Sequence, residues 1–397
     1  MFALTIHRDY ACGRSGACCT SGWHIPVETS TCEALAIALR AGRLQVPVRR
    51  TSAAPSAAAP VEALLQREAD LPDGCSAWLG LDDQGRCLYY EPGRGTCAIH
   101  RQLGGDGLPV SCRQFPRVSL IDARGTFVTL SHYCPTAARL LLRTDVGLGI
   151  EHAPPMAAAA GPLEGLEARD ALPPLVRPGF LHDLASYDAW ERGVVALLAR
   201  DDLSPEQALA GIANAAEQIR RWQRADGPLA TCVEWSLARH SEAPGAEDIL
   251  LASDPAAATR LWTTARRAVP PGVTAPALPG DVDGAWERLA ACNWPAFSAP
   301  VRHYLAARLF ASWMAYQGQG LRTLVASLFV ALGVLRVETA RACATEGRPL
   351  DADRLVEAFR MADLLVVHLA SPQALADRLL PVERSAGPPG SSIEWAG

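Results

Sequence analysis

The sequence lacks lysine entirely, so all 37 of its permanently basic side chains are arginine. A GC-rich coding bias explains this absence without any functional reason. The formal net charge at pH 7 is −5, so the chain also lacks the basic surplus typical of proteins that bind nucleic acid or anionic membranes. We therefore expect neither nucleic acid nor a membrane among its partners.

An export signal and a membrane-spanning run are also lacking. His7, Arg8 and Asp9 interrupt the segment where a signal peptide needs an unbroken apolar stretch. The longest apolar run, Leu324 to Leu335, is too short to cross a bilayer and indicates a buried helix. We expect a cytoplasmic protein, a setting in which structural disulfides are rare.

Cysteine, by contrast, is plentiful: the chain has 12, and seven lie in two stretches of its first third. A cytoplasmic setting favours metal-bound or redox-active thiolates over disulfides for such a group. The seven are Cys12, Cys18, Cys19, Cys87, Cys97, Cys112 and Cys134. Four others, Cys32, Cys232, Cys292 and Cys343, lie in apolar helical patterns and are expected to be small core residues. Cys75 fits either group.

The surroundings of these seven cysteines favour an iron–sulfur cluster. Such clusters take Cys thiolates, commonly four, held in loops whose backbone N–H groups approach the sulfurs. The stretch from residue 85 to 135 is rich in glycine and proline, which permits that approach. Arg113 and Arg117 follow Cys112, and their charge could stabilise an anionic cluster. The alternative is that both arginines are ordinary surface residues.

Zinc is the main alternative metal. Cys97 with His100, and His132 with Cys134, have short Cys/His spacings that zinc accepts. Paired C-x2-C units are absent, however, and seven thiols exceed the needs of one tetrahedral site. We therefore expect a 4Fe–4S cluster, with zinc and plain buried cysteine as the alternatives.

The expected fold is mainly α. A Cys-rich N-terminal domain (1–145), with short β-hairpins around a metal centre, precedes an α-helical domain (180–382). Residues 146–179 are predicted to be a linker, residues 383–397 a disordered tail, and residues 49–60 a low-complexity loop. Hairpins are predicted within 78–90 and 118–130.

Helix start signals support this assignment. Ser30 with Glu33 resembles a capping box, Ser204 precedes Pro205 and Gln207, and Pro135 occupies a first helical position. Further helices are predicted over 97–103, 187–200, 255–267, 304–316, 321–344 and 351–369.

The cysteine stretches, in order, read CCTSGWHI (18–25), GRC (85–87), CAIH (97–100), SCRQFPR (111–117) and LSHYCPTAARLLL (130–142). This series resembles the flagellin lysine-N-methylase (FliB-type) family. The YkgJ-type group of zinc- or iron-chelating domains shares part of it. The resemblance covers roughly residues 8–143, with fainter similarity over 187–219, from His303 onward and up to His368.

The resemblance implies a mostly α-helical protein with a 4Fe–4S cluster. Such a protein uses S-adenosylmethionine to methylate the ε-amine of lysines on flagellin or another protein substrate. The family's thiol positions fall on the seven cysteines named above. The chain departs from the family at Gly13–Ala17, where an additional Cys is usual. A lysine-free protein would also escape any lysine-modifying activity of its own.

Methyl transfer to lysine requires a neutral amine aimed at a sulfonium carbon. A dry pocket lowers the pKa of the amine, and a nearby base or aromatic rim can orient it. Tyr133, His303 and Tyr304 are the candidate catalytic residues. Two other functions stay open: a non-enzymatic YkgJ-type protein that binds zinc or iron, and a metal-free, thiol-based interaction module.

Overall fold

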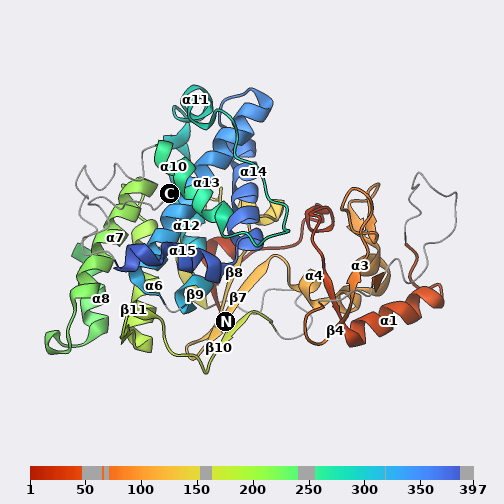
Figure 1. Cartoon of the computed structure of the whole chain (residues 1–397), viewed down its shortest axis with the longest axis horizontal. Coiled ribbons are helices and arrows are strands. Elements are labelled where there is room, and N and C mark those ends of the chain that lie inside the picture. The colour runs from red at the N-terminus through yellow and green to blue at the C-terminus, as the bar shows by residue number, and fades with distance from the viewer. Residues whose placement is uncertain (47–64, 67–70, 153–162, 240–254, 318, 385–397) are drawn as a thin grey trace. The chain divides into compact units, whose positions relative to one another are not determined.

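The structure, a computed structural model, describes residues 1–46, 65–66, 71–152, 163–239, 255–317 and 319–384. The chain divides into two compact units (Figure 1). Unit 1 comprises Met1–Asp9, Val118–Pro154 and Gly165–Gly397, and unit 2 comprises Tyr10–Arg117 and Pro155–Glu164. Helices predominate over several small sheets. The prediction of a mainly α protein is thereby confirmed.

The division between the units differs from a boundary at residue 145. Strand β1 (Phe2–Leu4) pairs in parallel with β8 (Gly125–Leu130) and antiparallel with β9 (Ile150–His152). These pairings place the N-terminus and the segment from Val118 onward in the helical unit. Local sequence patterns carry no information on such long-range pairing, which explains the difference.

The largest sheet belongs to unit 1 and has the order β10-β7-β8-β1-β9. Strand β7 (Arg117–Asp122) and β8 form the hairpin predicted over 118–130. Strand β10 (Leu166–Ala168) pairs in parallel with β7.

The prediction of a structureless linker over 146–179 is wrong where the structure describes it. That segment contributes β9, β10 and β11 (Leu175–Arg177), and β11 pairs with β12 (Phe180–Leu181). Short paired strands tolerate the Pro- and Gly-rich composition that suggested a linker.

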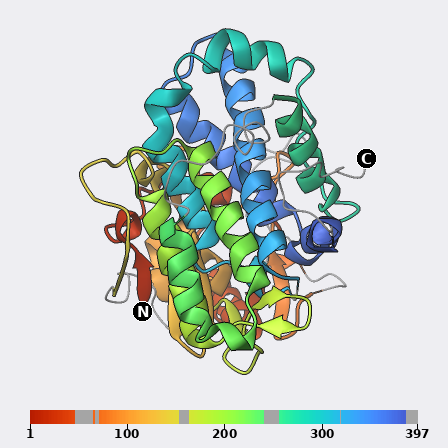
Figure 2. The ribbon, with the colours of Figure 1, turned by 90° about the vertical axis from the view of Figure 1, so that its left-hand side faces the viewer.

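The helices of unit 1 pack side by side (Figure 2). They are α5 (Pro135–Leu140), α6 (Leu184–Leu198), α7 (Pro205–Arg221), α8 (Leu229–Arg239), α10 (Pro255–Arg267), α11 (Val282–Ala285), α12 (Ser298–Leu309), α13 (Leu321–Glu346), α14 (Ala352–Asp363) and α15 (Pro372–Arg384). Helix α13 lies centrally and contacts α7, α10, α14 and α15. One hydrophobic cluster joins these helices to the sheet.

Helix α13 is long and apolar enough to cross a membrane by length and composition, but 89% of its most apolar window is buried inside the protein. A helix that is hydrophobic on all sides suits the centre of a helical core. The buried helix predicted from Leu324 to Leu335 is confirmed. It ends at Gly347, a left-handed C-cap with a φ of 63°.

Several helix starts follow the predicted signals. Ser204 and Gln207 form a capping box at α7, and Pro135 begins α5 with Cys134 as its N-cap. The helix predicted over 304–316 differs, because α12 ends at Leu309 and Ala311 has a φ of 56°.

The helix predicted over 351–369 changes type partway. Asp351 caps α14, which ends at Asp363 and continues as a π-helical turn, η8 (Leu364–Leu369). The N–H of Ala370 donates to the carbonyl of Leu365, five residues earlier. Such turns are rare and often occur at functional sites.

Unit 2 contains a three-stranded sheet, β2-β4-β3, made of Pro26–Glu28, Cys75–Leu79 and Leu65–Gln66. Its helices are α1 (Thr29–Arg40), α3 (Ala98–Leu103) and α4 (Val110–Gln114), and a two-stranded ribbon joins β5 (Tyr90–Glu91) to β6 (Thr96–Cys97).

Two local predictions for unit 2 need correction. Ser30 lies inside α1 rather than capping it. The hairpin predicted over 78–90 is wrong, because β4 pairs with β2 and β3, and only the bridge between Leu81 and Cys87 remains. The predicted loop at 49–60 and residues 385–397 of the predicted tail lie outside the described residues, while 383–384 belong to α15.

Candidate thiol site and a buried histidine cluster

The seven predicted cysteine ligands divide between the units. Six lie in unit 2, whereas Cys134 lies in unit 1. All twelve cysteines of the chain are thiols rather than disulfides. Among those expected to be core residues, Cys32 and Cys343 are buried and Cys232 is partly buried, but Cys292 is exposed.

The backbone of unit 2 draws several of these cysteines together. Cys18 and Cys19 lie in a 3-10 turn, η2 (Ala17–Cys19), and the N–H of Cys87 donates to the carbonyl of Cys19 at 2.8 Å. The N–H of Ala98, next to Cys97, donates to the carbonyl of Tyr89, two residues after Cys87, at 2.7 Å. These contacts connect three separate cysteine motifs.

The turn before Cys18 requires glycine at position 16. Gly16 has a φ of 72°, in the left-handed region, and a Cβ there would lie 2.5 Å from the ring of Tyr90. Only glycine meets both conditions. The close approach sets the Cys18–Cys19 turn against the ribbon that carries Cys97.

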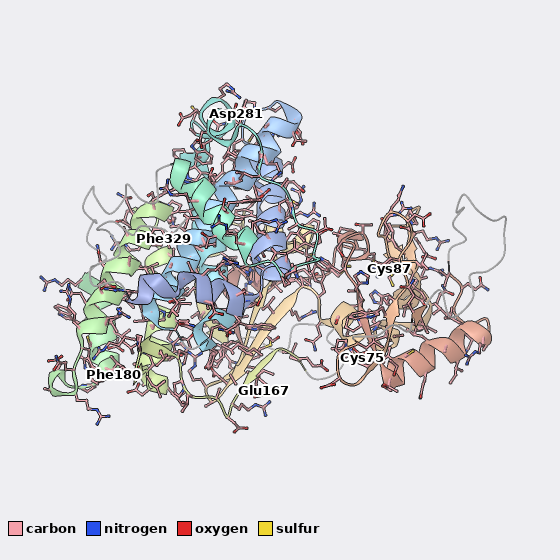
Figure 3. The ribbon with its side chains drawn as sticks, viewed as in Figure 1. Cys75, Cys87, Glu167, Phe180, Asp281 and Phe329 are labelled. Atoms are coloured by element: carbon pink, nitrogen blue, oxygen red, sulfur yellow. The ribbon has the colours of Figure 1, made fainter. Side chains whose placement is uncertain are left out.

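The thiols themselves make contact. The sulfurs of Cys18 and Cys19 are 3.9 Å apart, and the thiol of Cys19 also hydrogen-bonds with that of Cys97. The buried thiol of Cys112 lies within electrostatic reach of Cys87, Cys18 and Cys97. Five of the predicted ligands therefore share one region of unit 2, where Figure 3 labels Cys87.

Their electrostatics favour thiolates at two positions. The hydrogen bond from Cys19 lowers the pKa of Cys97 to about 7 against the effect of burial, and the backbone N–H groups of His100 and Ile99 assist. The same partner lowers the pKa of Cys18. Because Cys19 holds its proton between these two neighbours, its own pKa is raised. Thiolates are the form that binds metals.

The thiol contacts stop short of a formed metal site. Within the described ranges, no three His, Cys, Asp or Glu side chains are arranged to hold a metal ion. Cys12 is exposed. The 4Fe–4S cluster and the zinc alternative both stay predictions.

The two predicted arginines differ in what they touch. The Arg117 guanidinium packs over the ring of Tyr10 at 5.8 Å and donates to the carbonyl of Gln114 at 3.5 Å. Burial lowers its pKa, and the nearby Tyr10 and Cys12 oppose that effect. Arg113 lies partly buried in α4, directly after Cys112.

The three candidate catalytic residues lie in unit 1 and are buried. Tyr304 packs against Phe359, with ring centroids 5.3 Å apart, and meets the ring of His132 at 5.8 Å. Tyr133 meets the ring of His368 at 6.0 Å. Nδ1 of His303 hydrogen-bonds with the carbonyl of Leu141 at 2.9 Å. Each side chain is thus held by contacts inside the unit.

Two of these candidates border a buried polar cluster that the sequence analysis missed. Oδ2 of Asp363 accepts hydrogen bonds from the backbone N–H of His132 at 2.5 Å and from its Nδ1 at 3.1 Å. Nε2 of His132 lies 3.2 Å from Nε2 of His7. Arg308 forms an ion pair with Oδ1 of Asp363 at 3.5 Å, and Ser131 Oγ lies 2.6 Å from Nε2 of His368. Asp363 and both imidazoles of the His7–His132 pair are fully buried.

Local backbone structure explains the assembly of this histidine cluster. Asp363 and His368 are five residues apart, which the π-helical turn brings to one side, against Ser131 and His132. His7 ends the short helix η1 (Thr5–His7), which follows β1 directly. Since β1 pairs with β8, His7 comes beside the residues that follow β8.

The ionisation of the cluster follows from burial and charge. Burial opposes the ionised form of Asp363, but Arg308, His132 and the hydrogen bonds from His132 lower its pKa well below the ordinary value. Burial lowers the pKa of His7 and of His132, and it lowers that of His368 to about 4. The cluster therefore holds neutral imidazoles around one carboxylate and one guanidinium.

No sequence signal could have identified this cluster, because its members lie more than two hundred residues apart and share no motif spacing. Comparison with protein-family models, curated proteins and solved structures gives no match to this chain.

Proposed function

We propose that unit 2 binds a metal centre through its thiolates, a 4Fe–4S cluster, and that the protein is an S-adenosylmethionine-dependent protein lysine N-methyltransferase. The observation that carries the metal centre is the double contact of Cys19 with Cys18 and Cys97. The methyltransferase activity rests on the sequence resemblance.

The residues present fit a cluster by their donor chemistry. The donors are sulfurs, four of which an iron–sulfur cluster commonly takes, and backbone N–H groups already point at Cys97. Cys18, Cys19 and Cys97 would be ligands, with the fourth taken from Cys87 or Cys112. A bound cluster would supply a compact anionic centre that fixes the surrounding loops. Arg113, next to Cys112, is the arginine best placed along the chain to balance that charge.

In the proposed reaction, the lone pair of a neutral lysine amine forms a C–N bond with the methyl carbon of the sulfonium. The C–S bond breaks, and its electron pair stays on sulfur as a neutral thioether. The protein's part is to exclude water and to orient the amine. Tyr133, His303 and Tyr304 are the proposed residues for this role, and flagellin is the proposed substrate.

A second function, non-enzymatic binding of zinc or iron of the YkgJ type, is favoured by one observation. The contacts that suggest chemistry lie among thiols, whereas Tyr133, His303 and Tyr304 are engaged inside unit 1. A thiol site alone suffices for metal storage or delivery.

Anaerobic purification of the full chain tests the metal centre. We expect iron and acid-labile sulfide with visible charge-transfer absorption. Cys97→Ser should abolish iron binding, whereas Cys292→Ser, at an exposed position in unit 1, should preserve it. Stoichiometric zinc without sulfide would favour the YkgJ-type function. Metal-free thiols would overturn both functions.

The enzyme activity has a separate test. The cluster-loaded chain, S-adenosylmethionine and a lysine-containing flagellin should yield flagellin heavier by whole methyl groups. Unchanged flagellin, with the cluster intact, would overturn the methyltransferase and leave the metal site standing.

A further inference from the structure

The buried histidine cluster of unit 1 contains a polar atom whose hydrogen bonding is incomplete. His7 is fully buried, and its Nδ1 has no hydrogen-bond partner among the described residues. Buried polar side-chain atoms nearly always have a partner, and an exception calls for an explanation such as a bound water. The other ring nitrogen of His7 lies 3.2 Å from His132.

The positions of the protons follow from the chain of contacts. Asp363 is an ionised acceptor, so Nδ1 of His132, 3.1 Å from its Oδ2, must carry a proton. A neutral imidazole has one N–H, so Nε2 of His132 is then a bare acceptor. Nε2 of His7 must donate to it across 3.2 Å. Nδ1 of His7 is consequently a bare lone pair in a buried environment.

The surroundings decide what this lone pair can accept. Burial, His132, Arg308 and His303 all disfavour a positive charge on His7, and Asp363 opposes them only in part. His7 is therefore a poor proton acceptor and stays neutral. A bound anion would meet the lone pair, and a bound cation would add to the charge of Arg308. A neutral donor carries neither cost.

Two further polar atoms of the same cluster are buried without a hydrogen-bond partner in the described chain: the Tyr304 hydroxyl and Nε of Arg308. Both can donate. The Arg308 guanidinium lies 5.8 Å from the ring centroid of Tyr304, and the Tyr304 ring lies 5.8 Å from that of His132. A buried water typically makes about three hydrogen bonds with otherwise unsatisfied groups. One acceptor and two donors in one cluster match the two hydrogens and the lone pairs of a water.

We propose that unit 1 contains an internal binding site for one small neutral hydrogen-bond donor, a water molecule, at Nδ1 of His7. The row Asp363–His132–His7 fixes the direction of every hydrogen bond that leads to it. The site is independent of the thiols of unit 2 and of the proposed methyl transfer.

Nitrogen NMR of the full chain with labelled histidine tests the proposal. We expect long-range couplings that identify His7 as protonated on Nε2 and bare on Nδ1, together with magnetisation transfer from a bound water to its ring proton. A His7 protonated on Nδ1 would overturn the proposal. So would the expected tautomer without a water signal.

Matched variants sharpen the test. His7→Phe keeps a ring of similar size but removes the lone pair, so the bound-water signal should disappear. Ser131→Ala removes a hydroxyl that contacts His368 and lies outside the row, so the signal should persist. Loss of the signal in both variants would contradict the assignment to His7. If His7→Phe fails to fold, the wild-type tautomer and water signal still decide.

Discussion

The two units place their reactive side chains in opposite settings. Unit 1 buries imidazoles, a carboxylate and a guanidinium inside a large core of long helices. Unit 2 gathers soft thiols on short strands and turns around a much smaller hydrophobic cluster. A large core can stabilise a fold by itself, whereas a small one usually needs a metal or another cross-link. The comparison teaches that unit 1 should be self-sufficient and that unit 2 should depend on what its thiols bind.

Metal removal should give the largest difference between the units. If the thiols hold a metal, binding contributes on the order of 10 kcal/mol to the folding of its unit. We expect chelation under reducing conditions to make residues 10–117 sensitive to protease while the helices of unit 1 stay resistant. Limited proteolysis with mass spectrometry measures this. Equal resistance of unit 2 before and after chelation would contradict the metal dependence.

Removing Asp363 should damage unit 1 next most severely. Asp363→Ala leaves Arg308 as an uncompensated, largely buried charge and removes both hydrogen bonds from His132. Loss of one partner from a buried pair costs about 3–5 kcal/mol. Urea unfolding should show this loss in unit 1, with the metal content of unit 2 unchanged.

Asp353 provides the matched control for that substitution. It lies on the same helix and pairs with Arg139 at 2.9 Å, but both side chains are largely exposed. An exposed pair contributes about 0–1 kcal/mol. Similar losses for Asp353→Ala and Asp363→Ala would show that burial of the cluster is unimportant.

Acid should also act selectively on unit 1. Burial lowers the pKa of His7, His132, His303 and His368 in the folded state, whereas unfolded histidines titrate near 6.5. The unfolded state therefore binds more protons, and stability falls as the pH drops below about 6.5. For His368, with a folded pKa of about 4, the loss reaches at most about 3 kcal/mol.

Urea midpoints at pH 7.5 and pH 5 measure this effect, since few carboxylates titrate in that interval. His368→Gln should flatten the dependence. His182, also buried in unit 1 with a pKa lowered to about 4, lies outside the cluster and gives the comparison variant His182→Gln. A midpoint for unit 1 that is the same at both pH values would argue against neutral buried histidines.

The two units also differ in how far the sequence could describe them. Helix starts in unit 1 follow local chemistry, so Ser204 and Pro135 marked their helices correctly. In unit 2 the density of cysteines predicted a thiol region, and Cys18, Cys19 and Cys97 do meet. Local signals act within a few residues, and these predictions needed nothing more.

Long-range pairing explains what was missed. The contact of β1 with β8 assigns Met1–Asp9 to unit 1, and with it comes the meeting of His7 and His132. The position of Asp363 depends on a π-helical turn that no residue pattern announced. Each of these features arises from packing between segments that share no local signature.

Gly16 offers the smallest and most local way to test the thiol region. Gly16→Ala would place a Cβ 2.5 Å from the Tyr90 ring at a φ of 72°, whereas Gly42→Ala meets the same strain at a φ of 69° with nothing within 4 Å. The shared backbone strain costs about 1–2 kcal/mol. Only the first variant should also displace Cys18 and Cys19 from Cys97, so it should lose metal while Gly42→Ala retains it. Metal analysis of both proteins decides, because equal retention would mean that the contact of Gly16 with Tyr90 has no part in gathering the thiols.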